Sequence, residues 1–377
     1  MAVVVFGLYS SLFCFRKAFN VAAFEGHTLF GLSYKVVLVI TQVLGYMVSK
    51  FYGIGFIASL RRYNRGQLIL LLAGMALASW LVFALVPAPW GFWCLLFSGF
   101  PLGMLWGIVF SYVEGRRMTD LISAALAVSF IFGSGLAKSV GNAVMAAGAG
   151  EQWMPFITAA FFVLPVIICT RLADRFPPPN ADDIAHRAER KPMSRADRRR
   201  LLKQYGAGLS LLIGIYILVT ILREIRDSFM ADMWRESGET FSAAVFAQTE
   251  TIITLALLFV IAAMVLIKDN WKAFSLTHLI LCAGFASCLI ATLLYRQHSI
   301  GTWWWMLLVG LGLYLVYIPF NSILFDRFIA SFQIVGNVGF LIYLADSFGY
   351  LGSVAVMMIR NFFAGEVQWL AFSAPWC

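Results

Sequence analysis

Several charged side chains lie inside long apolar segments of this 377-residue chain, where water cannot solvate them. An Asp, Lys or Arg at the centre of a membrane helix costs roughly 2.5–3.5 kcal/mol. Such residues therefore need either an opposite charge or a function that requires a charge. The basic ones are Arg16, Lys17, Lys35, Lys50, Lys138, Arg223 and Arg226, and the acidic ones are Glu224, Asp227, Glu250 and Asp346.

The bases in this set outnumber the acids, which favours a binding site for a multiply charged anion. Arg16, Arg223 and Lys50 have no obvious spare acid in the sequence. An unpaired cation in a medium of low dielectric is unfavourable unless an anion reaches it. Arginine does not release its proton, and its planar guanidinium group can hold phosphate or carboxylate through two hydrogen bonds. We therefore expect Arg16 and Arg223 to face one another across an anion-binding cavity.

Other buried charges are expected to pair between helices. Lys17 can meet Asp227, and Lys138 can meet Glu250. An alternative for the whole set is that the charges only hold the helices together. Tyrosine hydroxyl groups can also bind phosphate oxygens, although ordinary packing is the alternative for any single tyrosine. The candidates are Tyr9, Tyr46, Tyr314 and Tyr317.

The composition indicates which environment these charges occupy. Hydrophobic residues make up 61% of the chain and charged residues 12%, and the mean hydropathy is +0.83. Average globular domains are about 45–50% apolar and about 25% charged, so a soluble enzyme, a disordered chain and a collagen-like chain are excluded. We predict an all-α polytopic membrane protein, because a membrane helix needs about 20 apolar residues. Eleven stretches qualify, namely 2–24, 31–58, 66–87, 90–112, 120–146, 153–171, 206–231, 244–267, 273–295, 302–325 and 332–359.

A twelfth apolar stretch, 367–377, is too short to span a bilayer, so we expect a truncated last helix. Basic residues fix the orientation, since cytoplasmic loops carry an excess of Lys and Arg. With the N-terminus inside, the cytoplasmic loops hold 18 basic residues and the opposite loops hold three. We therefore expect a multi-pass protein of the plasma (inner) membrane whose N-terminus and central loop are cytoplasmic. The same loops account for the net charge of +9 without a nucleic-acid partner.

The two parts of the chain resemble each other at a nearly constant offset, which predicts a parallel repeat. We expect an N-terminal six-helix half (1–171), a cytoplasmic linker (172–205) and a C-terminal half (206–377) of five full helices and a partial twelfth. This arrangement is typical of the major facilitator fold, in which substrates bind near the bilayer midplane between the halves. Gly7-x-Tyr9-x6-Arg16 recurs 207 residues later as Gly214-x-Tyr216-x6-Arg223. Two further motifs recur 208 residues later: Thr41-Gln42 as Thr249-Glu250, and Leu136-Ala137-Lys138-Ser139-Val140-Gly141 as Leu344-Ala345-Asp346-Ser347-Phe348-Gly349.

Motifs on seven of the expected helices resemble those of the organophosphate:phosphate antiporters, the major facilitator branch that holds the glycerol-3-phosphate and hexose-phosphate transporters. Asp346 is an acid that the closest family pattern lacks. The motifs are Tyr9-x6-Arg16-Lys17-x-Phe19, Tyr46-x-x-Ser49-Lys50-Phe51, Lys138-Ser139-Val140-Gly141, Leu222-Arg223, Glu250, Tyr317-x-Pro319 and Phe348-Gly349-Tyr350-Leu351-Gly352-Ser353-Val354-Ala355.

The resemblance implies a role for each of these residues. Arg16 and Arg223 would hold the phosphate, one from each half, and Lys50 would be a further cation near it. Lys138 would take the place of the family's substrate-binding histidine. Lys17 and Asp227 would form a bridge that breaks and reforms between the inward and outward states. A polar shell would be completed by Tyr9, Tyr46 and Tyr317.

The function predicted from these features is secondary transport of a small organic anion, with an organic phosphate exchanged for phosphate. One alternative is a proton-coupled transporter in which Glu250 and Asp346 titrate, and another is a membrane sensor that binds an anion without moving it. An enzyme is not expected, since there is no HExxH, G-x-S-x-G or P-loop motif. The six cysteines form no C-x-x-C pair, so neither a disulfide framework nor a zinc site is expected. We expect no metal and no cofactor. The expected partners are the anionic substrate and the bilayer, and the chain is expected to be a monomer.

Overall fold

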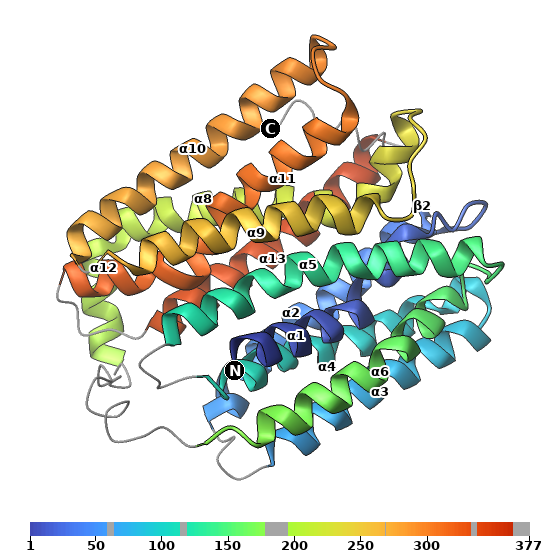
Figure 1. Cartoon of the computed structure of the whole chain (residues 1–377), viewed down its shortest axis with the longest axis horizontal. Helices are drawn as coiled ribbons and strands as arrows, with labels where there is room; N and C mark the ends of the chain where they lie inside the picture. Colours follow the sequence, from blue (N-terminus) through green and yellow to red (C-terminus); the bar gives the residue numbers. More distant parts are fainter. Residues whose placement is uncertain (59–63, 114–118, 178–194, 268, 333–337, 365–377) are drawn as a thin grey trace.

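The computed structural model describes residues 1–58, 64–113, 119–177, 195–267, 269–332 and 338–364. Long helices make up most of the described chain (Figure 1). A short antiparallel hairpin, β1 (Thr28–Leu29) and β2 (Leu32–Ser33), is the only sheet among these residues. It lies at the end of the molecule opposite the N-terminus of the first helix, and we call this end the hairpin end.

Six long helices form the N-terminal part of the structure. The short 3-10 turns η1 (Ala18–Val21) and η3 (Ala88–Trp90) follow the first helix and precede the fourth. The six are α1 (Ala2–Lys17), α2 (Tyr34–Ala58), α3 (Arg65–Leu85), α4 (Phe92–Phe110), α5 (Thr119–Ala146) and α6 (Met154–Asp174).

The C-terminal part contains longer and more interrupted helices. A π-helical segment, η4 (Phe320–Leu324), joins two of them directly after Pro319. A π-helical segment is uncommon and often marks a functional site. The helices are α8 (Arg195–Glu236), α9 (Val245–Val265), α10 (Asn270–Arg296), α11 (Thr302–Pro319), α12 (Phe325–Ser331) and α13 (Val338–Ala364).

These helices match the apolar stretches of the sequence. Nine stretches of described residues have the length and composition of membrane spans. The two remaining expected spans, 120–146 and 332–359, overlap α5 and α13. The expected partial span 367–377 lies outside the described residues. The domain boundaries at 171 and 206 stay predictions, although α6 ends at Asp174 and the next described helix begins at Arg195.

Helix ends follow local sequence signals. The side chain of Asn64 accepts hydrogen bonds from the backbone N–H groups of Gly66 and Gln67 and so caps the start of α3. Asp269 caps α10 in the same way through Lys272. Such caps satisfy N–H groups that have no partner inside the helix. Each cap therefore helps to fix the residue at which its helix begins.

Small residues let the long helices approach one another closely. A Cβ added at Gly99 of α4 would lie 2.3 Å from the backbone oxygen of Gln42 on α2, and one at Gly312 of α11 would lie 2.5 Å from that of Gly284 on α10. Membrane helices associate through such contacts, since lipid provides no hydrophobic drive for them to associate. Close packing of α2 against α4 fixes the face of α2 that carries Tyr46 and Lys50.

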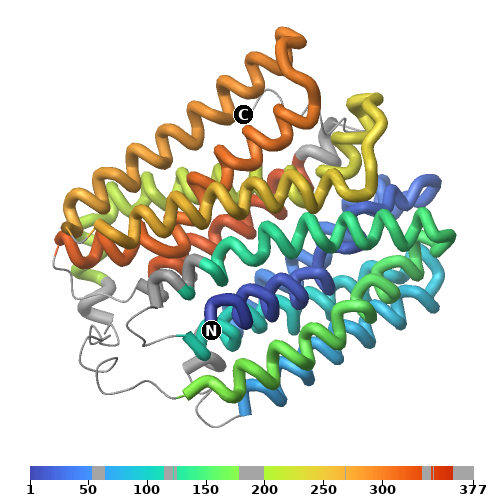
Figure 2. The backbone as a smooth tube through the Cα atoms, in the orientation of Figure 1, coloured from blue at the N-terminus to red at the C-terminus, as the bar shows by residue number. Residues whose placement is uncertain are grey.

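The two groups of helices meet along a shared boundary. Helix α5 runs beside α9, and α2 packs against α13. Figures 1 and 2 show α1–α6 on one side of this boundary and α8–α13 on the other. We call these groups the N-half and the C-half. The predicted site residues of α1, α2, α5, α8 and α13 thus come from helices at or beside the boundary.

Candidate functional site

A pocket lies between the two halves and contains six of the seven predicted substrate-binding residues. It contains ≈ 450 Å³ of space between atoms, part of it open to solvent, and is lined from both halves. Aromatic rings form much of its wall, and Lys50 lies 5.1 Å from the ring centre of Tyr46 and 5.2 Å from that of Trp106. The six predicted residues are Tyr9, Arg16, Tyr46, Lys50, Arg223 and Tyr317.

The two arginines converge on one carboxylate inside this boundary. The Arg16 Nη2 atom on α1 lies 3.4 Å from Glu224 Oε1, and Arg223 Nη2 on α8 lies 3.0 Å from Glu224 Oε2. Both guanidinium groups are almost fully buried. The expectation that the arginines have no acid was wrong, because Glu224 is shared between them. Neither side chain points to lipid.

Each arginine also lies over a tyrosine ring of its own half. The Cζ atom of Arg16 is 4.0 Å from the ring centre of Tyr46, and that of Arg223 is 4.4 Å from that of Tyr317. The stacking holds the planar groups in place. Among the described residues, the buried Nε atoms of both arginines have no hydrogen-bond partner. Two donors at repeat-related positions are therefore left for a ligand or for water.

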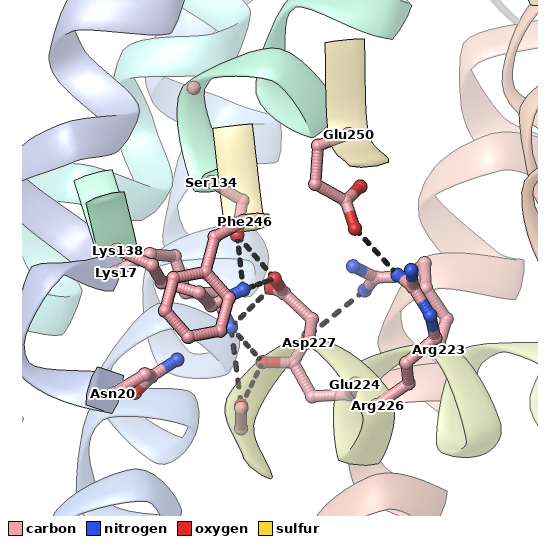
Figure 3. A network of polar contacts seen from close by, with 12 residues as sticks. Lys17, Asn20, Ser134, Lys138, Arg223, Glu224, Arg226, Asp227, Phe246 and Glu250 are labelled. Carbon is pink, nitrogen blue, oxygen red and sulfur yellow. Dashed lines mark hydrogen bonds and ion pairs between the residues drawn. The ribbon is translucent and has the colours of Figure 1, made fainter. Parts of the chain in front are cut away.

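A network of buried ion pairs connects Glu224 with residues that are not part of the pocket wall (Figure 3). The Lys17 Nζ atom lies 2.7 Å from Glu224 and 2.8 Å from Asp227. The predicted Lys17–Asp227 contact between α1 and α8 is therefore present, while its role in conformational change stays a prediction. Lys17 also donates to the hydroxyl oxygen of Ser228 at 3.3 Å.

Lys138 is not placed as predicted. Its Nζ atom lies 2.6 Å from Asp227 and 2.8 Å from the hydroxyl oxygen of Ser134, and the residue is fully buried. It is absent from the pocket wall described here. The predicted partner Glu250 instead lies 2.8 Å from Arg226. The reason is that Asp227 on α8 lies within reach of both Lys17 and Lys138, although the helix that packs along α5 is α9.

The network carries more positive than negative charge. Four cations share Glu224 and Asp227, which leaves a formal excess of two positive charges in this part of the described structure. The Arg226–Glu250 pair is neutral and does not change this balance. Buried charge without compensation is costly. A divalent anion in the pocket would neutralise the excess. The four cations are Arg16, Lys17, Lys138 and Arg223.

Lys50 has an acidic partner that the sequence analysis did not assign to it. The Lys50 Nζ atom on α2 lies 3.6 Å from Asp346 Oδ2 on α13, across the boundary between the halves. The hydroxyl group of Tyr216 donates a short hydrogen bond to Asp346 Oδ1. Glu250 and Asp346, the two carboxylates of the proton-coupling alternative, thus belong to separate ion pairs. Only Asp346 lines the pocket described here.

The main residue missed by the sequence analysis as an anion-site partner is Glu224. The repeat contained a signal for it, because an offset of 207 maps Arg16-Lys17 onto Arg223-Glu224. Lys17 and Glu224 therefore occupy equivalent positions and meet at the boundary. Trp106, Asn321 and Tyr350 were also missed, and no repeat or charge pattern in the sequence marks them as lining the pocket.

The halves are also connected at the hairpin end. Lys35 at the start of α2 lies 2.6 Å from Asp232 near the end of α8. Asp232 also contacts Arg235 at 2.8 Å, and Arg235 donates to the backbone oxygen of Val21 in the N-half. Lys35 donates in addition to the backbone oxygen of Asn20. We call this set the hairpin-end clasp.

Comparisons with known proteins identify the fold. A model of the family described as "Family of unknown function (DUF5690)" matches residues 18–376. A search of the curated proteins finds no match. Among solved structures, the nucleoside transporter NupG has a TM-score of 0.63 at 12% identity and covers 100% of this chain and 95% of its own.

Two further solved structures show the same likeness. The xylose transporter XylE from E. coli has a TM-score of 0.61 at 13% identity, covering 100% of this chain and 92% of its own. The human organic anion transporter MFSD10 (TETRAN) has a TM-score of 0.59 at 15% identity, covering 100% and 97%. The predicted all-α major facilitator fold is thereby confirmed, and the chain is a multi-pass membrane protein. At sequence identities this low, the likeness shows a shared fold and nothing more.

Proposed function

This chain belongs to the DUF5690 family, and we propose that it is a secondary transporter that exchanges small divalent oxyanions, with an organic phosphate and inorganic phosphate as its substrates. The fold supports transport, since major facilitator proteins move substrates through a site between their halves. Described residues contain no group of three or more His, Cys, Asp or Glu side chains that could hold a metal. The proposed binding uses the charged side chains that line the pocket.

One observation carries the proposal. Arg16 and Arg223, at repeat-related positions in opposite halves, line the same pocket and share a single carboxylate. Each has an unpartnered Nε donor among the described residues. Guanidinium groups bind phosphate and carboxylate through paired, charge-assisted hydrogen bonds. The excess of two positive charges around them matches an anion of charge −2.

The same geometry suggests how binding is coupled to movement. Glu224 holds Arg16, Arg223 and Lys17 when no anion is bound. An arriving anion competes with Glu224 for the two arginines and draws one residue from each half toward itself. The halves, which we propose correspond to residues 1–171 and 206–377, then rock about the occupied site. The empty site resists this change because its cations would be separated from Glu224, the carboxylate that neutralises them. Movement without a bound anion is therefore unfavourable, and exchange is favoured over net transport.

The proposal is tested with purified protein in proteoliposomes loaded with unlabelled phosphate. Uptake of external ³²P-phosphate should be saturable, and unlabelled glycerol 3-phosphate should compete with it. Arg16→Lys and Arg223→Lys should each reduce exchange by at least about tenfold, since a lysine cannot replace the bidentate contact. Arg296→Lys, at an exposed residue that ends α10, is the matched control and should exchange at the wild-type rate.

Size-exclusion profiles establish that the variants fold. Wild-type exchange in either arginine variant would refute the assigned role. Binding of phosphate without any exchange in the wild type would instead favour the sensor alternative. Uptake that depends on an imposed proton gradient would favour coupling through Glu250 or Asp346, although both carboxylates have basic partners at 2.8 and 3.6 Å.

The location of the protein forms part of the proposal. We propose an inner-membrane protein whose N-terminus and central loop face the cytoplasm, on the strength of the basic residues in the expected cytoplasmic loops. The hairpin end, with its clasp between Lys35 and Asp232, would then face outward. Labelling of an added cysteine at Glu25, an exposed residue next to the hairpin, tests this orientation in intact cells.

A further inference from the structure

We propose that Asp346 makes the pocket select oxyanions that present an O–H group to it, either on the anion itself, as hydrogenphosphate does, or on its organic part, as glycerol 3-phosphate does, over oxyanions of equal charge that present none, such as sulfate. The inference rests on the proposed function, because it concerns the same anion pocket. It adds a specificity-determining residue that is acidic, in a site whose other charged wall residues are basic.

Asp346 lies on α13 and lines the pocket together with Arg16, Lys50 and Arg223. Its side chain is 9% exposed. The Oδ1 atom accepts the hydrogen bond from Tyr216. The Oδ2 atom lies 3.6 Å from Lys50 Nζ, which is an ion-pair distance but longer than a hydrogen bond. Because Asp346 lines the pocket and Lys50 is too far away for a hydrogen bond, we assign the hydrogen bond to a ligand to Oδ2.

The carboxylate is held in place from behind. The side-chain amide of Asn321 in η4 donates to the Tyr216 hydroxyl oxygen at 3.0 Å, and Tyr216 in turn donates to Asp346. Tyr216 is 1% exposed. A chain of donors that all point toward Asp346 fixes the orientation of its carboxylate. The orientation of the Asp346 carboxylate in the pocket wall is thus set by these hydrogen bonds as well as by the contact with Lys50.

A fixed carboxylate distinguishes anions by their protons. Ionised carboxylates only accept hydrogen bonds, while arginine and lysine only donate them. Arg16, Arg223 and Lys50 therefore bind protonated and unprotonated oxyanions equally well. Asp346 repels an oxyanion whose oxygens are all acceptors, but it accepts a short O–H···O⁻ hydrogen bond from an oxyanion that carries a proton. Hydrogenphosphate carries such a proton at neutral pH, and sulfate does not.

Four anions of equal charge test this in the wild-type protein. At pH 8 phosphate and arsenate are divalent and keep one proton, whereas sulfate and selenate are divalent and have none. Arsenate and selenate are close in size, so that their comparison isolates the proton. We expect isothermal titration calorimetry to give affinities at least about tenfold higher for phosphate and arsenate than for sulfate and selenate. A difference of this size corresponds to the loss of one charge-assisted hydrogen bond.

Asp346→Asn tests the residue itself. An amide of the same shape can donate as well as accept, so sulfate should gain affinity and the phosphate-to-sulfate ratio should fall to within about threefold. Asp174→Asn is the matched control, since Asp174 accepts a hydrogen bond from Tyr112 at the far end of α6 and lines no part of the pocket. This control should keep the wild-type ratio.

Equal affinities for arsenate and selenate in the wild type would overturn the inference, and so would an unchanged ratio in a folded Asp346→Asn protein. If that variant does not fold, the order of the four affinities in the wild-type protein decides whether the inference holds. Failure of all four anions to bind the wild-type protein would refute the proposed function itself. Tight binding of sulfate alongside phosphate would refute only the role of Asp346.

Discussion

At the scale of single residues, Glu224 determines the electrostatics of the site. It contacts Arg16, Lys17 and Arg223 while it is itself fully buried. Its contacts join α1 and α8, so it connects the halves at the point where an anion would bind. Removal of one partner from a buried ion pair costs about 3–5 kcal/mol, because the remaining charge is left uncompensated.

We therefore expect Glu224→Gln to lower the free energy of unfolding by about 3 kcal/mol in the absence of anions. Saturating phosphate should restore part of this loss, since the anion neutralises the same cations. Thermal unfolding in detergent with and without phosphate measures both effects. Glu25→Gln, at an exposed residue before the hairpin, provides the control. An anion-independent loss of stability in Glu224→Gln would count against competition between Glu224 and the substrate.

The sequence was informative about which residues matter and less so about which residues pair. Apolar spans with charges inside them led to Arg16 and Arg223, and the pocket contains both. Lys138 was paired with the wrong acid, because sequence spacing does not specify how far each helix is rotated toward its neighbours. Asp227 faces both lysines only because α1, α5 and α8 converge. Glu224 was recognisable through the repeat, in which it replaces Lys17.

At the scale of helices, close contacts between α2 and α4 position the basic residues of α2. A methyl group at Gly99 would lie 2.3 Å from a backbone oxygen of α2, so the helices would have to move apart. Backbone atoms cannot rotate away as a side chain can. The face of α2 with Tyr46 and Lys50 would move with them.

Gly99→Ala should therefore lower both the unfolding temperature and the phosphate affinity. Gly74→Ala on α3 is the matched control, since an added Cβ there meets nothing within 4 Å. Alanine is favoured over glycine in a helix by about 1 kcal/mol, so Gly74→Ala should be neutral or slightly stabilising. Equal behaviour of the two variants in thermal unfolding would disagree with the close packing of α2 and α4.

The hairpin-end clasp gives a second prediction at this scale. Lys35 and Asp232 are the ion pair that joins α2 to α8 at this end among the described residues. Asp232→Asn should weaken the contact between the halves at the hairpin end and raise the reactivity of a cysteine introduced at Asn20 severalfold. The reactivity is measured with a thiol reagent in a protein without other cysteines. Asn20 is fully buried in the closed arrangement. Asp174→Asn at the opposite end should leave the reactivity unchanged, and an equal rise there would mean that the clasp does not control access.

At the scale of the whole molecule, hydropathy and the internal repeat predicted the fold. Both depend on the chain alone, since each apolar stretch must span the same bilayer and each half must form the same bundle. The interruptions in the C-half were not predicted, although Pro319 stands directly before the π-helical segment and a proline disturbs a regular helix. The pocket was not predictable from any local pattern, since its wall combines residues of two halves.

The central claim is that one anion binds between two arginines from opposite halves, and the location of a bound arsenate ion tests it most directly. Arsenate replaces phosphate closely and scatters anomalously at the arsenic edge. In crystals grown with arsenate, we predict one strong anomalous peak within hydrogen-bond distance of the guanidinium groups of both Arg16 and Arg223. A peak that touches only one of them, or a well-ordered pocket without a peak at saturating arsenate, would contradict the claim.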